Sequence, residues 1–153
     1  VRLVGSEMCI RDRDRLVQVY LERFGLDVSC LDRAGAAGGL AGGLAAMGAE
    51  LVDGVDLVAE EVRLDELVAG ADLVVTGEGW LDATSFQGQV VGGVAAYAAA
   101  AGVPLLVVVG GADEAAAARA DVVSLVDRFG IDRARTETTA CITEAVAERL
   151  ESL

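Results

Sequence analysis

DLVVTGEGWLDATSFQGQVVGGVAAYAAAAGVPLLVVV, residues 72–109, carries the pattern from which the fold class follows. It begins and ends with continuous apolar runs, residues 72–76 and 104–109, which are too short for helices and rich in valine, as buried strands are. Between them, the alanine-rich residues 90–101 predict a helix. Strand, helix and strand in this order form a βαβ unit with parallel strands and a right-handed crossover. We therefore expect an α/β fold with a parallel, Rossmann-like sheet in layers with flanking helices.

Further elements are expected on both sides of this unit. Apolar residues recur at helical spacing before Gly25, a residue type that commonly follows a helix end. A glycine-rich loop over residues 32–43 is expected to open into a helix of small residues that ends near Met47. The remaining expected elements are helices over residues 14–24, 55–62, 64–68 and 137–150, and a third strand over residues 121–126.

The charge of the chain limits its partners. Twelve arginines and no lysine stand against 25 acidic residues, which gives a formal net charge of -13 in 153 residues. Such a field repels polyanions, so neither nucleic acid nor an anionic membrane is an expected partner. No apolar run approaches the length of a membrane span. A small phosphorylated ligand stays compatible with this charge if a metal ion or backbone N–H groups supply local positive potential.

Cysteine and histidine usage narrows the chemistry further. Cys9, Cys30 and Cys141 are odd in number and widely spaced, which fits neither a disulfide framework nor a CxxC metal site. A reducing cytoplasm is the expected location. The chain has no histidine, so histidine acid–base chemistry and histidine metal ligands are excluded within it. Cys141 lies on an apolar face of the expected last helix and is interpreted as a core residue.

The first thirteen residues, VRLVGSEMCIRDR, have neither helical nor strand periodicity and lack the apolar core of a signal peptide. The string is similar to the translated adaptor tails found at the ends of gene fragments. We interpret residues 1–13 as a non-native tail, and residues 14–153 as the C-terminal portion of a longer protein. A disordered native N-terminus is the alternative.

Polar residues gather where the first buried strand is expected to end. The stretch TGEGWLDATSFQG, residues 76–88, is expected to be a loop, and it brings Glu78, Asp82 and Ser85 to the carboxyl edge of the sheet, where α/β proteins bind ligands. A carboxylate at this edge can hold Mg²⁺ or orient an attacking hydroxyl. Turn chemistry with an Asp or Ser cap for the next helix explains the same residues equally well. Two roles are open for Trp80, closing over a substrate or packing against the sheet edge, and packing is the favoured interpretation.

The glycine-rich segment DRAGAAGGLAGG, residues 32–43, admits two interpretations as well. Its backbone N–H groups could cradle a phosphate. However, it contains neither GxGxxG nor the GK[ST] ending of a P-loop, and small residues at helical spacing more often serve tight packing.

Taken together and in this order, the segments resemble the bacterial glycerate kinase family, of the glycerate 2-kinase type. The similarity covers nearly everything after Asp14, and the signature TGEG-x-[LI]-D-x-x-S-x-x-G at residues 76–88 is long and distinctive. The other matching segments are GAAGGLAGGLAAMGAEL at residues 35–51 and GVAAYAAAAGVPLLVVVGG at residues 93–111.

The resemblance implies a two-domain α/β enzyme that transfers the γ-phosphoryl group of ATP, with Mg²⁺, to D-glycerate and gives phosphoglycerate. It also implies that a missing N-terminal half of the same chain completes the site, so that the fragment alone is inactive. Glu78 and Asp82 are then the catalytic residues and the Mg²⁺ ligands. The implied substrate or phosphate contacts are Gly35, Ala36, Ala37, Gly38, Gly39, Thr76, Gly77, Gly79, Ser85, Gly88 and Gln89.

Two departures from the family pattern keep other functions open. Relatives usually have lysine where this chain has Gln89, and many have arginine where it has Trp80, so positive charge is lost from a phosphate site. The second hypothesis is therefore a non-catalytic small-molecule-binding relative that has lost kinase activity. The third is a truncated product that exposes apolar surface and aggregates.

Overall fold

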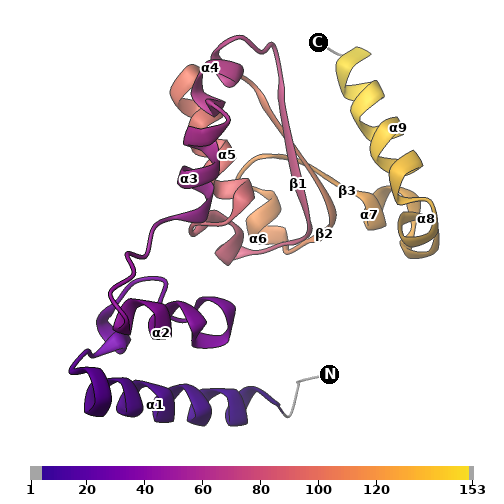
Figure 1. Cartoon of the computed structure of the whole chain (residues 1–153). Coiled ribbons are helices and arrows are strands. Elements are labelled where there is room, and N and C mark those ends of the chain that lie inside the picture. Colours follow the sequence, from indigo (N-terminus) through magenta and orange to yellow (C-terminus); the bar gives the residue numbers. More distant parts are fainter. Residues whose placement is uncertain (1–4, 152–153) are drawn as a thin grey trace. The chain divides into compact units, whose positions relative to one another are not determined.

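The computed structural model describes residues 5–151, which divide after Asp53 into two compact units (Figure 1). The elements of the first unit are helix α1 (Gly5–Phe24), the 3-10 turns η1 (Val28–Cys30) and η2 (Ala36–Gly39), and helix α2 (Leu40–Ala46). Helix α1 ends where the sequence predicts, since Gly25 follows at φ +69° and its N–H donates to the Leu21 carbonyl at 3.0 Å. It begins at Gly5, so residues 5–13 are helical although their sequence shows no helical period.

Small residues of α2 allow close packing inside the first unit. The Gly42 N–H donates to the carbonyl of Ala34 at 3.0 Å, and a Cβ atom at Gly42 would lie 3.2 Å from that oxygen. A Cβ atom at Gly43 would lie 2.8 Å from the hydroxyl of Tyr20 on α1. The second half of the glycine-rich segment therefore serves packing, which is one of the two interpretations given above.

The second unit alternates helices with a parallel sheet. Its helices α3 (Gly54–Glu61) and α4 (Leu64–Ala69) occupy the predicted positions. Helix α5 has the predicted bounds, Val90–Ala101, and connects β1 (Val74–Leu81) to β2 (Leu105–Ala112). The other elements are η3 (Ala83–Phe86), α6 (Glu114–Ala117), β3 (Asp121–Ser124), α7 (Leu125–Phe129), α8 (Ile131–Thr136) and α9 (Thr138–Glu151). The strand order is β1-β2-β3 and both pairs are parallel, which confirms the predicted α/β class and its βαβ unit.

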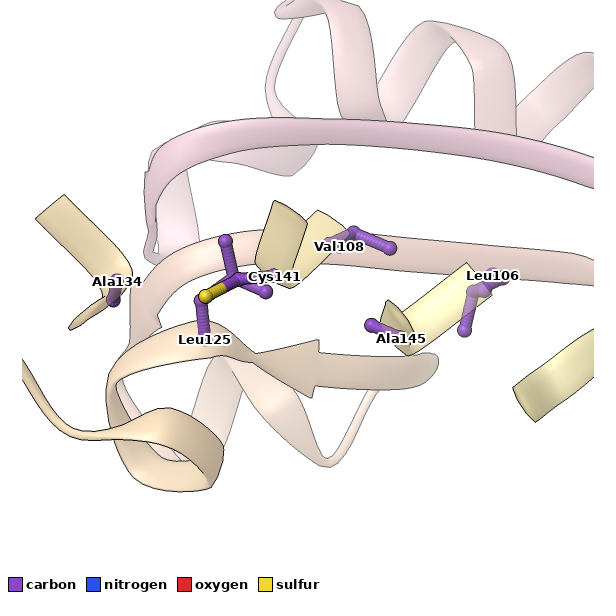
Figure 2. Packing of buried hydrophobic residues seen from close by; sticks show 6 residues of the cluster. All are labelled: Leu106, Val108, Leu125, Ala134, Cys141 and Ala145. Carbon is purple, nitrogen blue, oxygen red and sulfur yellow. The ribbon is translucent and has the colours of Figure 1, made fainter. Parts of the chain in front are cut away.

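Helices cover both faces of this sheet, with α3, α4, α5 and α6 on one side and α7, α8 and α9 on the other (Figure 1). The central strand β2 is continuously apolar because each of its faces is buried. Its Val107 and Val109 face α5 and α6, in a cluster with Leu81, Val91 and Ala116. Its Leu106 and Val108 pack with Leu125, Ala134, Cys141 and Ala145 against α7, α8 and α9 (Figure 2).

Cys141 is completely buried in that cluster, so its interpretation as a core residue is confirmed (Figure 2). Within residues 5–151, no helix is both long enough and apolar enough to cross a membrane.

Strand ends differ most from the sequence prediction. Strand β1 continues to Leu81, whereas its apolar run ends at Thr76, because the residues beyond Thr76 still pair with β2. Strand β3 stops at Ser124, two residues before the predicted end at Val126. The Ser124 hydroxyl accepts a hydrogen bond from the Asp127 N–H at 3.3 Å and so begins helix α7 instead.

Candidate functional site

The first half of the predicted loop over residues 76–88 is strand, which corrects the sequence interpretation. Thr76, Gly77, Glu78 and Gly79 all belong to β1, and the true loop begins only at Asp82. The register pairs Thr76 with Val107, Gly77 with Val108 and Glu78 with Val109. The signature residues are therefore held by a sheet ladder, which positions them more rigidly than a loop would.

The glycines of the signature permit close backbone approach. A Cβ atom at Gly77 would lie 2.0 Å from the carbonyl oxygen of Val108, so no side chain fits there without moving the sheet. A Cβ atom at Gly110 of β2 would lie 2.5 Å from the carbonyl oxygen of Gly79. At positions 77 and 110 the backbones of β1 and β2 are thus unusually close, and glycine is needed at these two positions.

Glu78 lies at the wall of a cavity of about 700 Å³ in the second unit. Its strand partner Val109 belongs to the cluster on the α5 face, so the Glu78 side chain projects from the same face. Its Oε1 atom is buried and has no hydrogen-bond partner within the described part of the chain. The cavity is lined by Gly54, Val55, Val58, Ala59, Val62, Leu64, Gly77, Glu78, Gly88, Gln89, Val90 and Val94. A carboxylate oxygen in such mainly apolar surroundings is available to a ligand that brings positive charge or a donor.

Asp82 acts as a helix cap. Its Oδ1 accepts hydrogen bonds from the Thr84 N–H at 2.7 Å, from the Thr84 hydroxyl at 2.6 Å and from the Ser85 N–H at 3.3 Å. These bonds, the Thr84 hydroxyl first, hold the pKa of the Asp82 carboxyl below its ordinary value. Turn and cap chemistry at Asp82 is therefore confirmed, but the capped element is the short turn η3 and not the helix expected over residues 90–101. All three of these hydrogen bonds end on Oδ1.

Ser85 and Gln89 are tied to this cap. The buried Ser85 hydroxyl accepts a hydrogen bond from the Asp82 N–H at 3.0 Å. The Gln89 side-chain amide donates to the Thr84 hydroxyl at 3.3 Å, and Gly88 before it has a φ of +82°. The side chain at position 89 thus contacts the cap, while the residue also lines the cavity beside Glu78.

Trp80 packs over the sheet end, which agrees with the favoured interpretation. Its ring lies on Gly111, where a Cβ atom would be 2.5 Å from Cζ3. Its Nε1–H donates to Oδ1 of Asp113 at 3.3 Å, although the residue stays 57% exposed. The sequence interpretation missed Asp113. Its position directly after β2, at the carboxyl edge of the sheet, could have identified it.

Arg119 is a second residue that the sequence analysis missed. Its guanidinium carbon lies 3.9 Å from the centre of the Phe86 ring, a cation–π contact that places positive charge beside the η3 turn. In the sequence it is the only basic residue between Arg63 and Arg128. Its isolation in the sequence is the feature that could have identified Arg119 as a candidate.

The predicted site residues therefore form four groups. Gly77, Glu78, Gly88 and Gln89 line one cavity, whereas Asp82 and Ser85 belong to the hydrogen-bonded cap and do not line it. Thr76 and Gly79 line, with Gly77 and Glu78, a second cavity of about 510 Å³.

The fourth group, residues 35–39, belongs to the first unit. There η2 is kinked, because Ala37 and Gly38 have positive φ values of 51° and 70°. The structure therefore leaves the phosphate interpretation of Gly35, Ala36, Ala37, Gly38 and Gly39 a prediction.

Comparison with a family model and with curated relatives identifies a family for the chain. The family model described as the glycerate kinase family matches residues 8–152. A glycerate kinase of Halalkalibacterium halodurans is 40% identical over 111 residues, which are 69% of this chain and 29% of that protein. The glycerate 2-kinase of Escherichia coli K12 is 35% identical over 133 residues, which are 84% of this chain and 33% of that protein.

A solved structure of a glycerate kinase 2 from Salmonella typhimurium LT2 has 27% sequence identity and a TM-score of 0.47, and the match covers 90% of this chain and 38% of that one. This chain thus spans about a third of the length of the relatives it matches. Because the family model matches residues 8–152, nearly the whole sequence, the chain belongs to the glycerate kinase family.

Proposed function

We propose that residues 14–153 are the C-terminal portion of an ATP-dependent glycerate kinase, which transfers the γ-phosphoryl group of ATP to D-glycerate and gives phosphoglycerate. The kinase class follows from the family. The observation that supports a site in this portion is Glu78, whose buried Oε1 has no hydrogen-bond partner in the described residues and which lies at the wall of a cavity of about 700 Å³. A buried unpaired carboxylate oxygen costs stability and therefore calls for a functional explanation.

Glu78 fits the role of an oxygen ligand to Mg²⁺. Within the described chain, no group of three or more acidic or cysteine side chains is placed to hold a metal. This is compatible with Mg²⁺, which proteins usually bind through one or two carboxylates together with substrate phosphates and water. When bound, the ion would neutralise charge on the transferred phosphoryl group. Glu78 would hold the ion or orient the glycerate hydroxyl from the rigid β1 ladder.

Asp82 has a narrower role in this proposal. Its Oδ1 is occupied by the η3 cap, so only Oδ2 remains for a ligand. Its carboxyl is ionised at neutral pH, as a metal or hydroxyl contact requires, and the lowering of its pKa by the cap extends this to more acidic conditions. We propose that Asp82 positions the loop of residues 82–89 and contributes Oδ2 to the site, with Ser85, Gly88 and Gln89 nearby.

The remaining contacts would come from other parts of the protein. We propose that residues 35–39 approach an anionic group of a ligand through their backbone N–H groups. The upstream half of the polypeptide would complete the site, residues 1–13 would be a non-native tail, and this portion alone would be inactive. The enzyme would act in the cytoplasm.

A non-catalytic relative that binds a small molecule is the second candidate. The observation that favours it is the absence of arginine and lysine from the described residues that line the Glu78 cavity. Gln89 stands there as a neutral amide bonded to Thr84, and Trp80 is bonded to Asp113. A phosphate site is expected to need positive charge, which this portion does not supply at either position.

ADP release distinguishes the two candidates. Residues 14–153 joined to their native upstream half would be assayed with Mg²⁺, ATP and D-glycerate. Glycerate-dependent ADP release supports the kinase and shows that Gln89 is tolerated. A folded full-length protein that binds ligand but releases no ADP supports the non-catalytic relative.

A further inference from the structure

Strand β1 lies at an edge of the sheet, and its outer side pairs with no strand in residues 5–151. The Val74 N–H donates to the carbonyl of Pro104 at 2.9 Å, which fixes the alternation of the backbone along the strand. In a parallel ladder, alternate residues point both polar groups to the same neighbour. Val74, Thr76 and Glu78 therefore bond to β2, and the N–H and C=O groups of Val75 and Gly77 point to the open side.

Apart from the inward-pointing Glu78, the described part of the chain gives this edge few of the features that usually protect one. Free strands are normally short, or they carry lysine, proline or a covering segment, because an unpaired edge recruits other strands. Strand β1 has eight residues, VVTGEGWL, with neither lysine nor proline. Val75 is 44% exposed, and Gly77 is exposed and has no side chain to block an approaching backbone.

Apolar surface continues from the edge into the Glu78 cavity. Val58 and Val62, on and just after α3, are 60% and 49% exposed at the cavity wall, and Val90 at the start of α5 is 58% exposed. Exposed apolar side chains around one cavity are typical of an interaction surface. The same cavity holds the unpartnered Oε1 of Glu78, so the missing partner must offer both apolar contact and a donor.

We propose that the open edge of β1 receives a β-strand from the part of the full-length polypeptide outside this chain. The same segment covers the cavity and brings a basic or hydrogen-bond-donating side chain to Glu78. The inference rests on the proposed function, since it requires the longer enzyme. The Halalkalibacterium relative has the necessary length, because this chain spans only 29% of it.

A second copy of this chain fits the open edge of β1 less well than a segment of the same polypeptide does. Each copy has a formal net charge of -13, so two copies repel each other. Two β1 edges would also bring a second unpartnered Glu78 to the interface without supplying a cation. A segment with arginine or lysine satisfies Glu78 and offsets the excess negative charge.

Amide hydrogen exchange of the chain and of the full-length protein tests the strand. In residues 1–153 alone, the amides of Val75 and Gly77 are expected to exchange much faster than those of Thr76 and Glu78, which bond to β2. In the full-length protein the Val75 and Gly77 amides should slow by roughly 100-fold or more, as stable sheet amides do. Unchanged fast exchange in the folded full-length protein overturns the proposal.

Glu78→Gln tests the partner of the carboxylate, with Mg²⁺ removed by a chelator in every sample. In the chain alone the substitution replaces a carboxylate whose buried Oε1 has no hydrogen-bond partner among the described residues, and it is expected to raise Tm. In the full-length protein it removes one member of a pair and is expected to lower Tm. Glu60→Gln, at an exposed position of α3, is the matched control and should change neither value. A Tm that rises in both proteins contradicts a basic or donating partner.

These readouts are independent of turnover. Protected Val75 and Gly77 amides without ADP release would leave the strand proposal standing and reject the kinase. ADP release without protection would reject the strand alone.

Discussion

The side chains of Asp82 and Ser85 each accept a hydrogen bond from the backbone N–H of the other residue. The Ser85 N–H donates to Asp82 Oδ1 at 3.3 Å, and the Asp82 N–H donates to the Ser85 hydroxyl at 3.0 Å. This reciprocal pair is a capping box at the start of η3. Asp82, the second acidic residue of the signature at residues 76–88, therefore has a structural role that exists before any ligand binds. Its contribution to folding can be measured separately from the catalytic role proposed for it.

Ser85→Ala is expected to destabilise the chain by about 1 kcal/mol, because the Asp82 N–H loses its acceptor at a site where Ser85 is only 1% exposed. Urea unfolding followed by circular dichroism measures the change. Thr143→Ala, at an exposed position of α9, is the control and should stay within about 0.5 kcal/mol of the parent chain. Equal effects of the two substitutions would contradict the capping box.

The cap also predicts a pH dependence. The pKa of Asp82 is lowered in the folded chain, so its stabilising contribution is complete above the unfolded pKa of about 4 and is lost as the pH falls through the folded value. Asp82→Asn still caps the turn but does not titrate. The stability difference between the parent chain and Asp82→Asn should therefore shrink below about pH 4. Urea unfolding at pH 7, 4 and 3 measures this difference, and a constant value would contradict it.

Asp82→Asn separates the cap from the proposed catalytic role in the full-length protein. Asparagine retains a capping oxygen, so the chain should keep its fold with only a small loss of stability, whereas loss of the charge is expected to lower kcat by roughly 100-fold. The rate of ADP release measures kcat, and circular dichroism checks the fold. An unchanged kcat would remove Asp82 from the catalytic residues and leave it a capping residue only.

Gly77→Ala is expected to destabilise the second unit by about 3 kcal/mol, since the new Cβ atom would lie 2.0 Å from the Val108 carbonyl oxygen and force the strands apart. Gly79→Ala is a close control on the same strand, because no atom lies within 4 Å of the position its Cβ would take. It should cost less than about 1 kcal/mol. Thermal unfolding compares the two, and equal losses would show that the close strand approach is not the cause.

The predictable parts of this fold were those with a strong local pattern. Helix α5 matches its predicted bounds because Gly102 stops an alanine-rich run by adopting φ +69°. The end of β1 was not predictable in this way, because residues 77–79 are held in the strand by pairing with β2, which local sequence does not report. Four short elements, η3, α6, α7 and α8, are too brief to show a helical period.

The sequence predicted which residues belong to the candidate site, but not which of them lie together in the structure. The sequence placed Glu78 and Asp82 in one loop, whereas they lie on a strand and in a cap, and only Glu78 lines the cavity of about 700 Å³. The alternation of side chains along β1 decides which face Glu78 joins, and it depends on the register with β2. Asp113 reaches Trp80 only because parallel strands end at the same edge.

Gln89→Lys tests whether lost positive charge limits the full-length protein. Gln89 lines the Glu78 cavity and donates only a 3.3 Å hydrogen bond to Thr84, so replacing it should leave the fold intact. A lysine there would attract the phosphate of ATP or the carboxylate of glycerate, and roughly a tenfold lower KM for one of them is expected. Gln89→Met, which has similar length and no charge, is the control. Steady-state ADP release gives both constants. A KM lowered by lysine but not by methionine would show that position 89 faces the anionic ligand, whereas identical values for the two variants would place the ligand's charge elsewhere.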